Sequence, residues 1–229
     1  MTTQNLQTRI SQLNTRIAAA CGRCGRLPDS VKTVVVTKTH PAETLQAVID
    51  TGIADIGENK VQEIVQKAPL LTGTRCLHMV GHLQTNKVNK VVPLVDWIHS
   101  VDSVRLLEKI DTACDREGKR IKVLVQVNTS AEESKSGIEP ENALGLCEKA
   151  AQCANVEFRG LMTIGPWDGG EQDTRLSFIQ LRELGEQCSG LCDKIELSMG
   201  MSGDFEWSIE EGATIIRIGS LLLGERNYT

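Results

Sequence analysis

The sequence lacks any apolar run near the roughly 20 residues that a membrane-spanning helix needs. Its first residues, 1–5, lack the positive-then-apolar pattern of a secretory signal. Positive charge is also in short supply, since 30 Asp and Glu residues outnumber 25 Lys and Arg residues and give a net charge of −5. General nucleic-acid binding requires a basic surface. These absences exclude the membrane and nucleic-acid-binding classes, and we expect a cytoplasmic protein.

Cysteine is present eight times, but only Cys21 and Cys24 have the C-x-x-C spacing of a redox or metal motif. A zinc site needs about four ligands in a compact group, and the sequence has no second pair of this kind. The pair also follows a helical stretch, whereas a thioredoxin-like motif opens a helix after a strand. A chain of 229 residues can bury a core without disulfides. We therefore expect reduced thiols, no metal site, and no assigned role for the Cys21–Cys24 pair.

Short runs rich in β-branched residues alternate with amphipathic helical windows along the chain, which predicts parallel strands joined by helical crossovers. The predicted strands are residues 33–38, 53–57, 77–81, 96–99, 121–128, 156–164, 195–199 and 214–219. The predicted helices between them are residues 41–51, 58–69, 84–92, 102–117, 140–153, 171–189 and 204–211, and an extra helix at 4–20 precedes the first strand.

Eight strand–helix units favour closure into a single TIM-type (β/α)₈ barrel with an extra N-terminal helix. The alternative is an open doubly wound sheet, but no G-x-G-x-x-G motif follows the first strand. No linker or shift in composition divides the chain, so we expect one domain over residues 1–229. The irregular stretch 129–139 follows the fifth strand, and we interpret it as a candidate lid.

Polar residues follow the ends of most predicted strands, and in a barrel these ends meet at one rim, where catalytic and binding residues lie. Lys38 ends the first strand, directly after a run of β-branched residues. A solvated charge at a strand terminus is the alternative interpretation of this lysine. The other polar residues at predicted strand ends are Glu58, Asn59, His82, Asn128, Thr163, Ser198, Ser202, Arg217 and Ser220.

The seventh and eighth strand ends, 198–204 and 217–220, are rich in glycine and serine. The corresponding loops of barrels frequently bind phosphate, because small residues let backbone N–H groups approach an anion and hydroxyls add donors. Ser202 and the pair Gly219–Ser220 suit the two halves of such a site. The alternative is that both segments are ordinary helix caps.

A phosphate site facing Lys38 indicates a phosphorylated carbonyl compound held by the lysine amine. A lysine with its ordinary pKa of about 10.4 is mostly protonated, and partial burial beside a cation such as Arg217 would free the amine. Two ligand classes fit this arrangement. One is a sugar phosphate in a Schiff-base aldolase, and the other is pyridoxal 5′-phosphate.

Seven segments in order along the chain carry a recognisable pattern: residues 36–41, 57–63, 78–87, 133–137, 160–164, 198–204 and 217–219. Together they resemble the pyridoxal phosphate homeostasis protein family (YggS/PROSC-like), which is related to the N-terminal barrel of alanine racemase. The resemblance implies that Lys38 forms an internal aldimine with pyridoxal phosphate and that Arg217 faces the pyridine nitrogen. It also implies that Ser202, Gly219 and Ser220 bind the phosphate and that Asn59 and Met201 belong to the same pocket.

Three positions depart from the usual pattern of that family. Thr37 stands where serine is usual, His40 where lysine or a similar residue is usual, and His82 where proline is usual. None of the three is implied to bind the ligand, and His82 is the one placed to alter the end of the third strand.

Two functions compete, a racemase-like catalyst and a protein that holds, buffers or delivers pyridoxal phosphate. Racemisation of the alanine racemase type needs a second base, a tyrosine from a second domain, and the only tyrosine here is the penultimate residue, Tyr228. Arg217 beside the pyridine nitrogen would disfavour ring protonation and weaken carbanion stabilisation. We therefore predict a monomeric homeostasis protein with little or no racemase activity, which serves apo-enzymes that the sequence does not identify.

Overall fold

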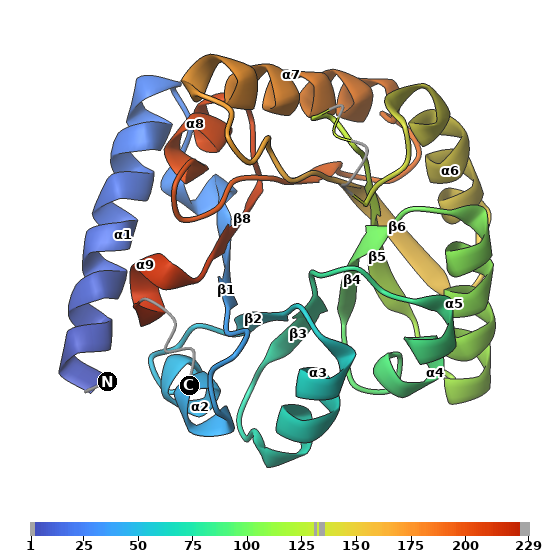
Figure 1. Cartoon of the computed structure of the whole chain (residues 1–229), viewed down its shortest axis with the longest axis horizontal. Coiled ribbons are helices and arrows are strands. Elements are labelled where there is room, and N and C mark those ends of the chain that lie inside the picture. The colour runs from blue at the N-terminus through green and yellow to red at the C-terminus, as the bar shows by residue number, and fades with distance from the viewer. Residues whose placement is uncertain (1–2, 131, 133–135, 225–229) are drawn as a thin grey trace.

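The computed structural model describes residues 3–130, 132 and 136–224, and these residues form a closed barrel of parallel strands in chain order, β1 to β8 (Figure 1). The strands are β1 (Lys32–Val36), β2 (Asp55–Glu58), β3 (Cys76–Met79), β4 (Trp97–Val101), β5 (Ile121–Gln126), β6 (Val156–Met162), β7 (Glu196–Ser198) and β8 (Ile215–Ile218). β8 pairs with β1, which closes the sheet. The predicted TIM-type barrel is confirmed, and the open-sheet alternative is wrong.

Helices surround the barrel, and those between β1 and β8 lie in the connections from one strand to the next, whereas α1 and η1 precede β1 and α9 follows β8. They are α1 (Thr3–Arg23), η1 (Pro28–Ser30), α2 (Ala42–Ile49), α3 (Val61–Lys67), η2 (Ala68–Leu70), η3 (Thr85–Lys87), α4 (Val88–Val91), α5 (Val104–Glu117), α6 (Pro140–Gln152), α7 (Glu171–Gln187), α8 (Phe205–Glu210) and α9 (Ser220–Leu223). The sequence did not predict η1 or α9, which are too short to show a helical period. No helix in the described ranges is both long and apolar enough to cross a membrane.

Helix α5 illustrates how local sequence sets the ends of an element. Ser103 stands at the N-cap, and its side-chain oxygen accepts a hydrogen bond from the Leu106 amide at 3.4 Å. The helix ends at Gly118, whose φ of +58° lies in the left-handed region that glycine adopts without strain. Between these ends, the buried residues recur at helical spacing and pack one face of α5 onto the barrel.

The barrel interior is filled by a small apolar cluster from alternate strand positions: Val34, Val36, Val80, Trp97, Leu124, Met162 and Ile215. Closing the sheet tightly leaves no room for a side chain at Gly57, because a Cβ there would lie 2.9 Å from Val34 Cγ1. A second and larger apolar core lies between the outer strand faces and the helices. The barrel is therefore a filled core, and only its rim is open for binding.

Several predicted strands run two residues past their observed ends. The first strand was predicted to end at Lys38 but ends at Val36, and the fifth ends at Gln126 in place of Asn128. The cause is visible at Thr37, whose amide still donates to Gly57 O at 2.9 Å while the chain already turns away. Lys38 is thus a turn residue beyond the strand, which is a correction to the sequence prediction.

Part of the candidate lid, residues 131 and 133–135, lies outside the described residues. Ile138, near the end of this segment, is hydrogen-bonded to the end of β5 and the residues after it. Asn128 N donates to Ile138 O at 2.9 Å, and Ile138 N donates to Gln126 O at 2.8 Å. Closure of this segment over a ligand stays a prediction. All eight cysteines are free thiols.

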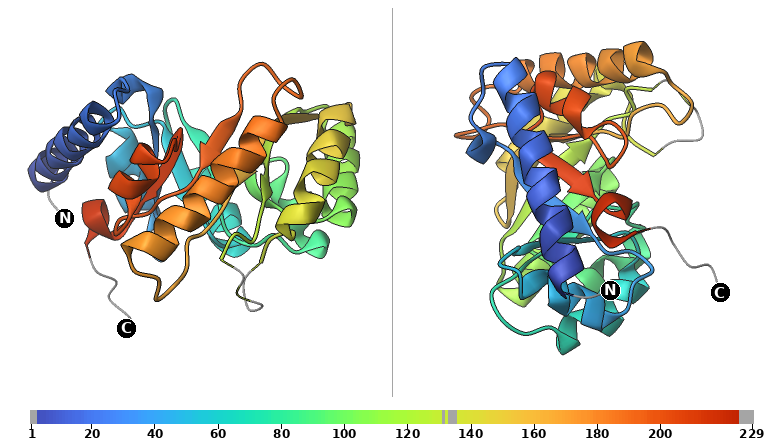
Figure 2. Two further views of the ribbon diagram at one scale, coloured as in Figure 1. Left: turned by 90° about the horizontal axis from the view of Figure 1, so that it is seen from above. Right: turned by 90° about the vertical axis from the view of Figure 1, so that its left-hand side faces the viewer.

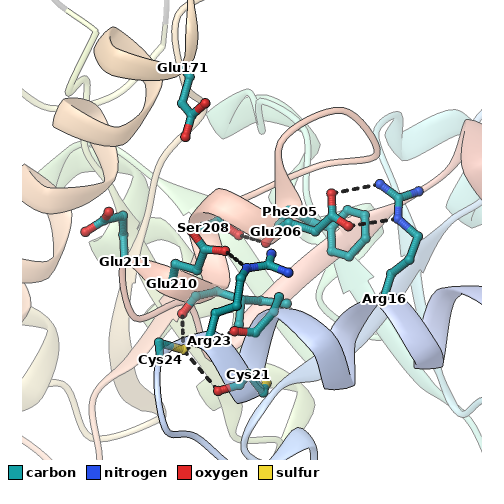
Figure 3. Close-up of polar contacts among 12 residues, drawn as sticks. Arg16, Cys21, Arg23, Cys24, Glu171, Phe205, Glu206, Ser208, Glu210 and Glu211 are labelled. Carbon is teal, nitrogen blue, oxygen red and sulfur yellow. Dashed lines mark hydrogen bonds and ion pairs between the residues drawn. The ribbon is translucent and has the colours of Figure 1, made fainter.

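The extra helix α1 lies beside α8 and α9 in both views of Figure 2. Arg16 on α1 donates two hydrogen bonds of 2.9 Å to the carboxylate of Glu206 on α8, and its guanidinium carbon lies 4.7 Å from the centre of the Phe205 ring. Arg23 pairs with Glu210 at the other end of α8 (Figure 3). Because α8 follows the loop after β7, α1 supports that loop from behind.

The Arg16–Glu206 pair should make stability depend on pH. The hydrogen bond from Arg16 lowers the pKa of Glu206, against a smaller opposing effect of burial. A carboxyl group with a lowered folded-state pKa stabilises the protein above its unfolded pKa of about 4.3, and this stabilisation is lost as pH falls through the folded-state value. Glu206→Gln should therefore lower the free energy of unfolding by about 0.5–1 kcal/mol at neutral pH.

Urea unfolding at neutral pH and at pH 3 measures this difference, which should be smaller at pH 3 than at neutral pH. Glu186→Gln is the matched control, because Glu186 is an exposed partner of Arg182 at 3.8 Å and should contribute little at either pH. An equal loss from Glu206→Gln at both pH values would contradict the ion-pair account.

Candidate functional site

Lys38 lies in a tight turn at the carboxyl end of β1. His40 N donates to Thr37 O at 3.1 Å and closes the turn, and Thr37 is fully buried beneath it. Val34 and Val36 point into the barrel, and Lys38 follows them at the same two-residue spacing. The side chain is half-buried, so the solvated-charge interpretation does not describe it.

The closure of the barrel brings the eighth strand end next to Lys38. Val34 is in register with Arg217, and Val35 is in register with Ile218. A Cβ on Gly219 would lie 3.1 Å from Val36 O, which is closer than most Cβ contacts in proteins, so the backbone after β8 runs close to the end of β1. A side chain at this position would push the two strand ends apart by a few tenths of an ångström.

The loops after β7 and β8 meet at Ser202. Its Oγ accepts hydrogen bonds from the amides of Gly219 at 3.3 Å and Leu221 at 3.4 Å. It does not cap α8, because Asp204 occupies that N-cap and accepts from the Met201 amide. The helix-cap alternative is therefore wrong for Ser202 with respect to α8, whereas Gly219 is the N-cap of α9 and Ser202 accepts from the first amides of that helix. A hydroxyl and two backbone amides converge at this point, which is a donor set suited to a phosphate.

Ser220 and Met201 lie at the edges of the same two loops. Ser220 is exposed at the first position of α9, and Met201 is exposed directly before Ser202. The Met201 amide donates to Asp204, and the residue is 37% exposed.

Arg217 is buried in the mouth of the barrel, 5% exposed. Its Nη1 donates to Ser198 Oγ at 2.8 Å, and its Nη2 donates to Thr163 O at 2.8 Å. Burial lowers the pKa of Arg217 to about 10, and nearby Asp204 opposes the shift. The guanidinium therefore remains charged at neutral pH and is held by two strand ends.

A file of polar side chains leads from Arg217 down the barrel axis. Ser198 Oγ lies 3.0 Å from His99 Nδ1, and His99 Nε2 lies 2.9 Å from His78 Nδ1. His78 Nε2 then lies 3.0 Å from Asp55 Oδ1 near the opposite end of the barrel. Burial lowers the pKa of both histidines, strongly so for His99, so both rings are neutral.

The directions of these hydrogen bonds follow from the two ends of the file. The Asp55 carboxylate can only accept, so His78 carries its proton on Nε2 and accepts at Nδ1. His99 must then donate from Nε2 and accept at Nδ1, which Ser198 satisfies with its hydroxyl proton. Ser198 Oγ is left free to accept from Arg217. Every donor in the file points away from Arg217, and the arrangement fixes the orientation of the guanidinium.

Asp55, Cys76 and His78 also bring three possible metal-ligating atoms within 4.8 Å of one another. Burial raises the pKa of Cys76 to about 12, so this thiol stays protonated, and Lys32 Nζ lies 3.3 Å from Asp55 Oδ1. A protonated thiol and an adjacent ammonium both disfavour a bound cation. Hydrogen bonds and an ion pair account for this group.

Asn59 marks the second strand end, on the other side of Lys38 from β8. A Cβ on Gly81 would lie 2.3 Å from Asn59 O, so the chain after β3 touches the chain after β2. His82, where the sequence departs from the family pattern, points to the fourth strand end and lies 3.5 Å from Asp102. The departure leaves the contact between Gly81 and Asn59 intact.

The structure thus gathers the predicted residues at one rim. On one side of the Lys38 turn, Gly219 is hydrogen-bonded to Ser202, and Arg217 and Ser220 lie near Gly219 along the chain. Asn59 follows β2 on the other side, and Met201 directly precedes Ser202. Sequence reasoning missed His99 as the support of Arg217. The sequence did carry a signal for His99, because it follows Trp97 by two residues on β4 and therefore faces the barrel interior as Trp97 does. A polar side chain buried at such a position needs a hydrogen-bond partner.

Residues 10–227 match the family model described as "Alanine racemase, N-terminal domain". The chain is 41% identical to the "Pyridoxal phosphate homeostasis protein" of Aquifex aeolicus, covering 98% of this chain and 100% of that one. It is 39% identical to the human protein of the same name, covering 95% and 85% of the two chains.

Among solved structures, the chain is similar to PipY of Synechococcus elongatus with PLP bound. The TM-score is 0.80 at 34% identity, and the alignment covers 91% of this chain and all of that one. The likeness therefore extends over most of the chain. On this similarity of sequence and fold, the chain belongs to the pyridoxal phosphate homeostasis protein family, within the alanine racemase N-terminal domain group.

Proposed function

We propose that this chain binds pyridoxal 5′-phosphate at the rim of the barrel and serves to hold, buffer or deliver it. The observation that carries the proposal is the meeting of Ser202 Oγ with the Gly219 and Leu221 amides beside the Lys38 turn. An amine and a group of anion-binding donors are what a phosphorylated aldehyde requires. The PLP-bound PipY and the names of the homeostasis relatives support the same ligand.

In this proposal the chain's residues have separate roles. Ser202, Gly219 and Ser220 would hold the phosphate, and Lys38 would hold the aldehyde end. Arg217 would face the ring nitrogen, with Asn59 and Met201 at the pocket edge. The cofactor supplies an aldehyde carbon that forms a C=N bond with an amine, releasing one water that carries the aldehyde oxygen, with no change in oxidation state.

Storage is favoured over catalysis by the charge at Arg217. Its guanidinium is buried, charged and already committed to Ser198 and Thr163, so it would offer the ring nitrogen a donor and no proton acceptor. A ring nitrogen without a proton is a weak electron sink. The second base of a racemase would have to come from Tyr228, which lies outside the described residues. A racemase-like enzyme is the alternative function.

The proposal extends to the setting of the protein. We infer that residues 1–229 act as one domain and as a monomer in the cytoplasm, and that the recipients are apo-enzymes that use pyridoxal phosphate. The names of the relatives describe homeostasis proteins and support a role in supplying the cofactor.

Lys38 should be the residue that carries the cofactor. Borohydride reduction of the purified complex, followed by digestion and mass spectrometry, should find the modification on the peptide that contains Lys38. Lys38→Ala should abolish the reducible complex and retain weaker binding, since the phosphate contacts remain. Lys60→Ala is the control, because Lys60 is exposed on the neighbouring strand end. Modification of Lys60 or Lys135 in the wild type, with none on Lys38, would contradict the assignment.

The phosphate site should contribute independently of the lysine. Ser202→Ala and Ser220→Ala should each weaken binding of pyridoxal 5′-phosphate by about 1–2 kcal/mol, the worth of a hydrogen bond to a charged group. Neither change should affect pyridoxal, which lacks the phosphate. Titration calorimetry with both ligands measures the effect, and Ser189→Ala on the exposed end of α7 is the control. Equal wild-type affinities for the two ligands would rule out a phosphate site here.

A further inference from the structure

A buried cluster of charged groups lies behind the turn that carries Lys38. It joins Glu58 at the end of β2 to Glu63 and Lys67, which lie one helical turn apart on α3. Lys67 Nζ is 2.8 Å from Glu58 Oε1 and 2.6 Å from Glu63 Oε2, and it donates to Thr37 O at 3.4 Å. An ammonium group has three N–H donors, so these acceptors occupy all of them.

Stability alone is a poor reason for this cluster. Glu58 and Lys67 are 2% and 8% exposed, and burial raises the pKa of Glu58 against the opposing effect of Lys67. The second oxygen of Glu58, Oε2, has no hydrogen-bond partner among the residues that the structure describes. Apolar side chains of similar size often fill such a space at least as favourably as a buried ion pair.

The cluster holds the two peptide groups that flank the Lys38 Cα. On the N-terminal side, Lys67 donates to the carbonyl of Thr37, and Thr37 Oγ1 donates to Glu58 Oε1 at 2.7 Å. On the C-terminal side, the amide of Thr39 donates to Glu63 Oε2 at 2.7 Å. The peptide groups on both sides of the Lys38 Cα are therefore hydrogen-bonded to the same cluster.

Thr39, within the turn that these hydrogen bonds hold, has an unusual backbone conformation. Its φ of +69° is in the left-handed region, and it is the one non-glycine residue with positive φ among those described. A β-branched residue rarely adopts this region, because its side chain crowds the backbone. Thr39 is exposed, so burial of its side chain does not hold it there, and the contacts across the turn are the hydrogen bond from the Thr39 amide to Glu63 and the one from His40 N to Thr37 O.

We propose that Glu58, Glu63 and Lys67 are positioning residues that fix the Lys38 turn so that the lysine amine meets the carbonyl carbon of a ligand anchored by its phosphate. This inference rests on the proposed function. The three residues act through the backbone at Thr37 and Thr39 and do not touch the ligand. They set how well the amine reaches the aldehyde and leave the phosphate contacts unaffected.

The test compares two ligands that share the ring and the phosphate. Pyridoxal 5′-phosphate has the aldehyde, whereas pyridoxine 5′-phosphate has an alcohol in its place and cannot bond to Lys38. The ratio of their dissociation constants measures the contribution of the lysine bond. Glu63→Ala should reduce the wild-type preference for the aldehyde by about tenfold or more, since small displacements of reacting groups have large effects. Binding of pyridoxine 5′-phosphate should stay within about twofold, which also reports that the pocket is folded.

A second variant separates strain from general damage. Adding Thr39→Gly to Glu63→Ala should recover about threefold of the lost preference, because glycine adopts positive φ without cost. The matched control is Glu171→Ala, which removes a carboxylate from the i,i+4 pair with Arg175 on α7 and should leave the ratio unchanged.

The outcomes distinguish this inference from the proposed function. A wild type that shows no preference for the aldehyde would defeat the proposed function. A wild type with a strong preference that Glu63→Ala retains would overturn the positioning role of the cluster. Equal weakening of both ligands by Glu63→Ala would also overturn it, because the cluster would then support the pocket as a whole.

Discussion

The pairing of β8 with β1 is the constraint on which the site depends. It aligns Val34 with Arg217 and brings the backbone of Gly219 close to that of Val36. An open sheet that kept the strands in this chain order would put the first and last strand ends at opposite edges, with Lys38 far from Arg217. Closure turns residues about 180 positions apart in sequence into neighbours at one rim.

Two buried polar systems support that rim from different sides. The file from Asp55 to Ser198 runs inside the barrel and orients Arg217. The cluster of Glu58, Glu63 and Lys67 joins the end of β2 to α3 and is hydrogen-bonded to the turn around Lys38. A buried polar group is costly unless it is paired, so both systems hold the groups they contact in a narrow range of positions. The lysine and the arginine are thereby placed on a rigid frame.

Much of this arrangement could be predicted from the sequence. The alternation of β-branched runs with helical windows is strong in every repeat, and it identified all eight strands and the helices long enough to show a period. The rim residues were recognisable because parallel strands bring their carboxyl ends to one face. Lys38 and Arg217 were found in this way.

The remaining features depend on contacts between distant segments. The end of β1 at Val36 is set by where the chain diverges from β2, which no local pattern reports. Glu63 and Lys67 read as an ordinary i,i+4 pair on a helix face, and only the packing of α3 against the Lys38 turn buries them. Ser202 resembled a helix cap, yet its partners Gly219 and Leu221 belong to another loop.

We propose that the pocket holds pyridoxal phosphate and is poorly equipped to catalyse with it, because Arg217 would offer the ring nitrogen a charged donor and no proton acceptor. Solvent deuterium incorporation into alanine by the cofactor-loaded wild type, followed by mass spectrometry, tests this most directly. The account predicts exchange far slower than ordinary enzymatic turnover, on the order of 1 s⁻¹ or more. Exchange of alanine at or above that rate would contradict the account and restore the racemase-like alternative.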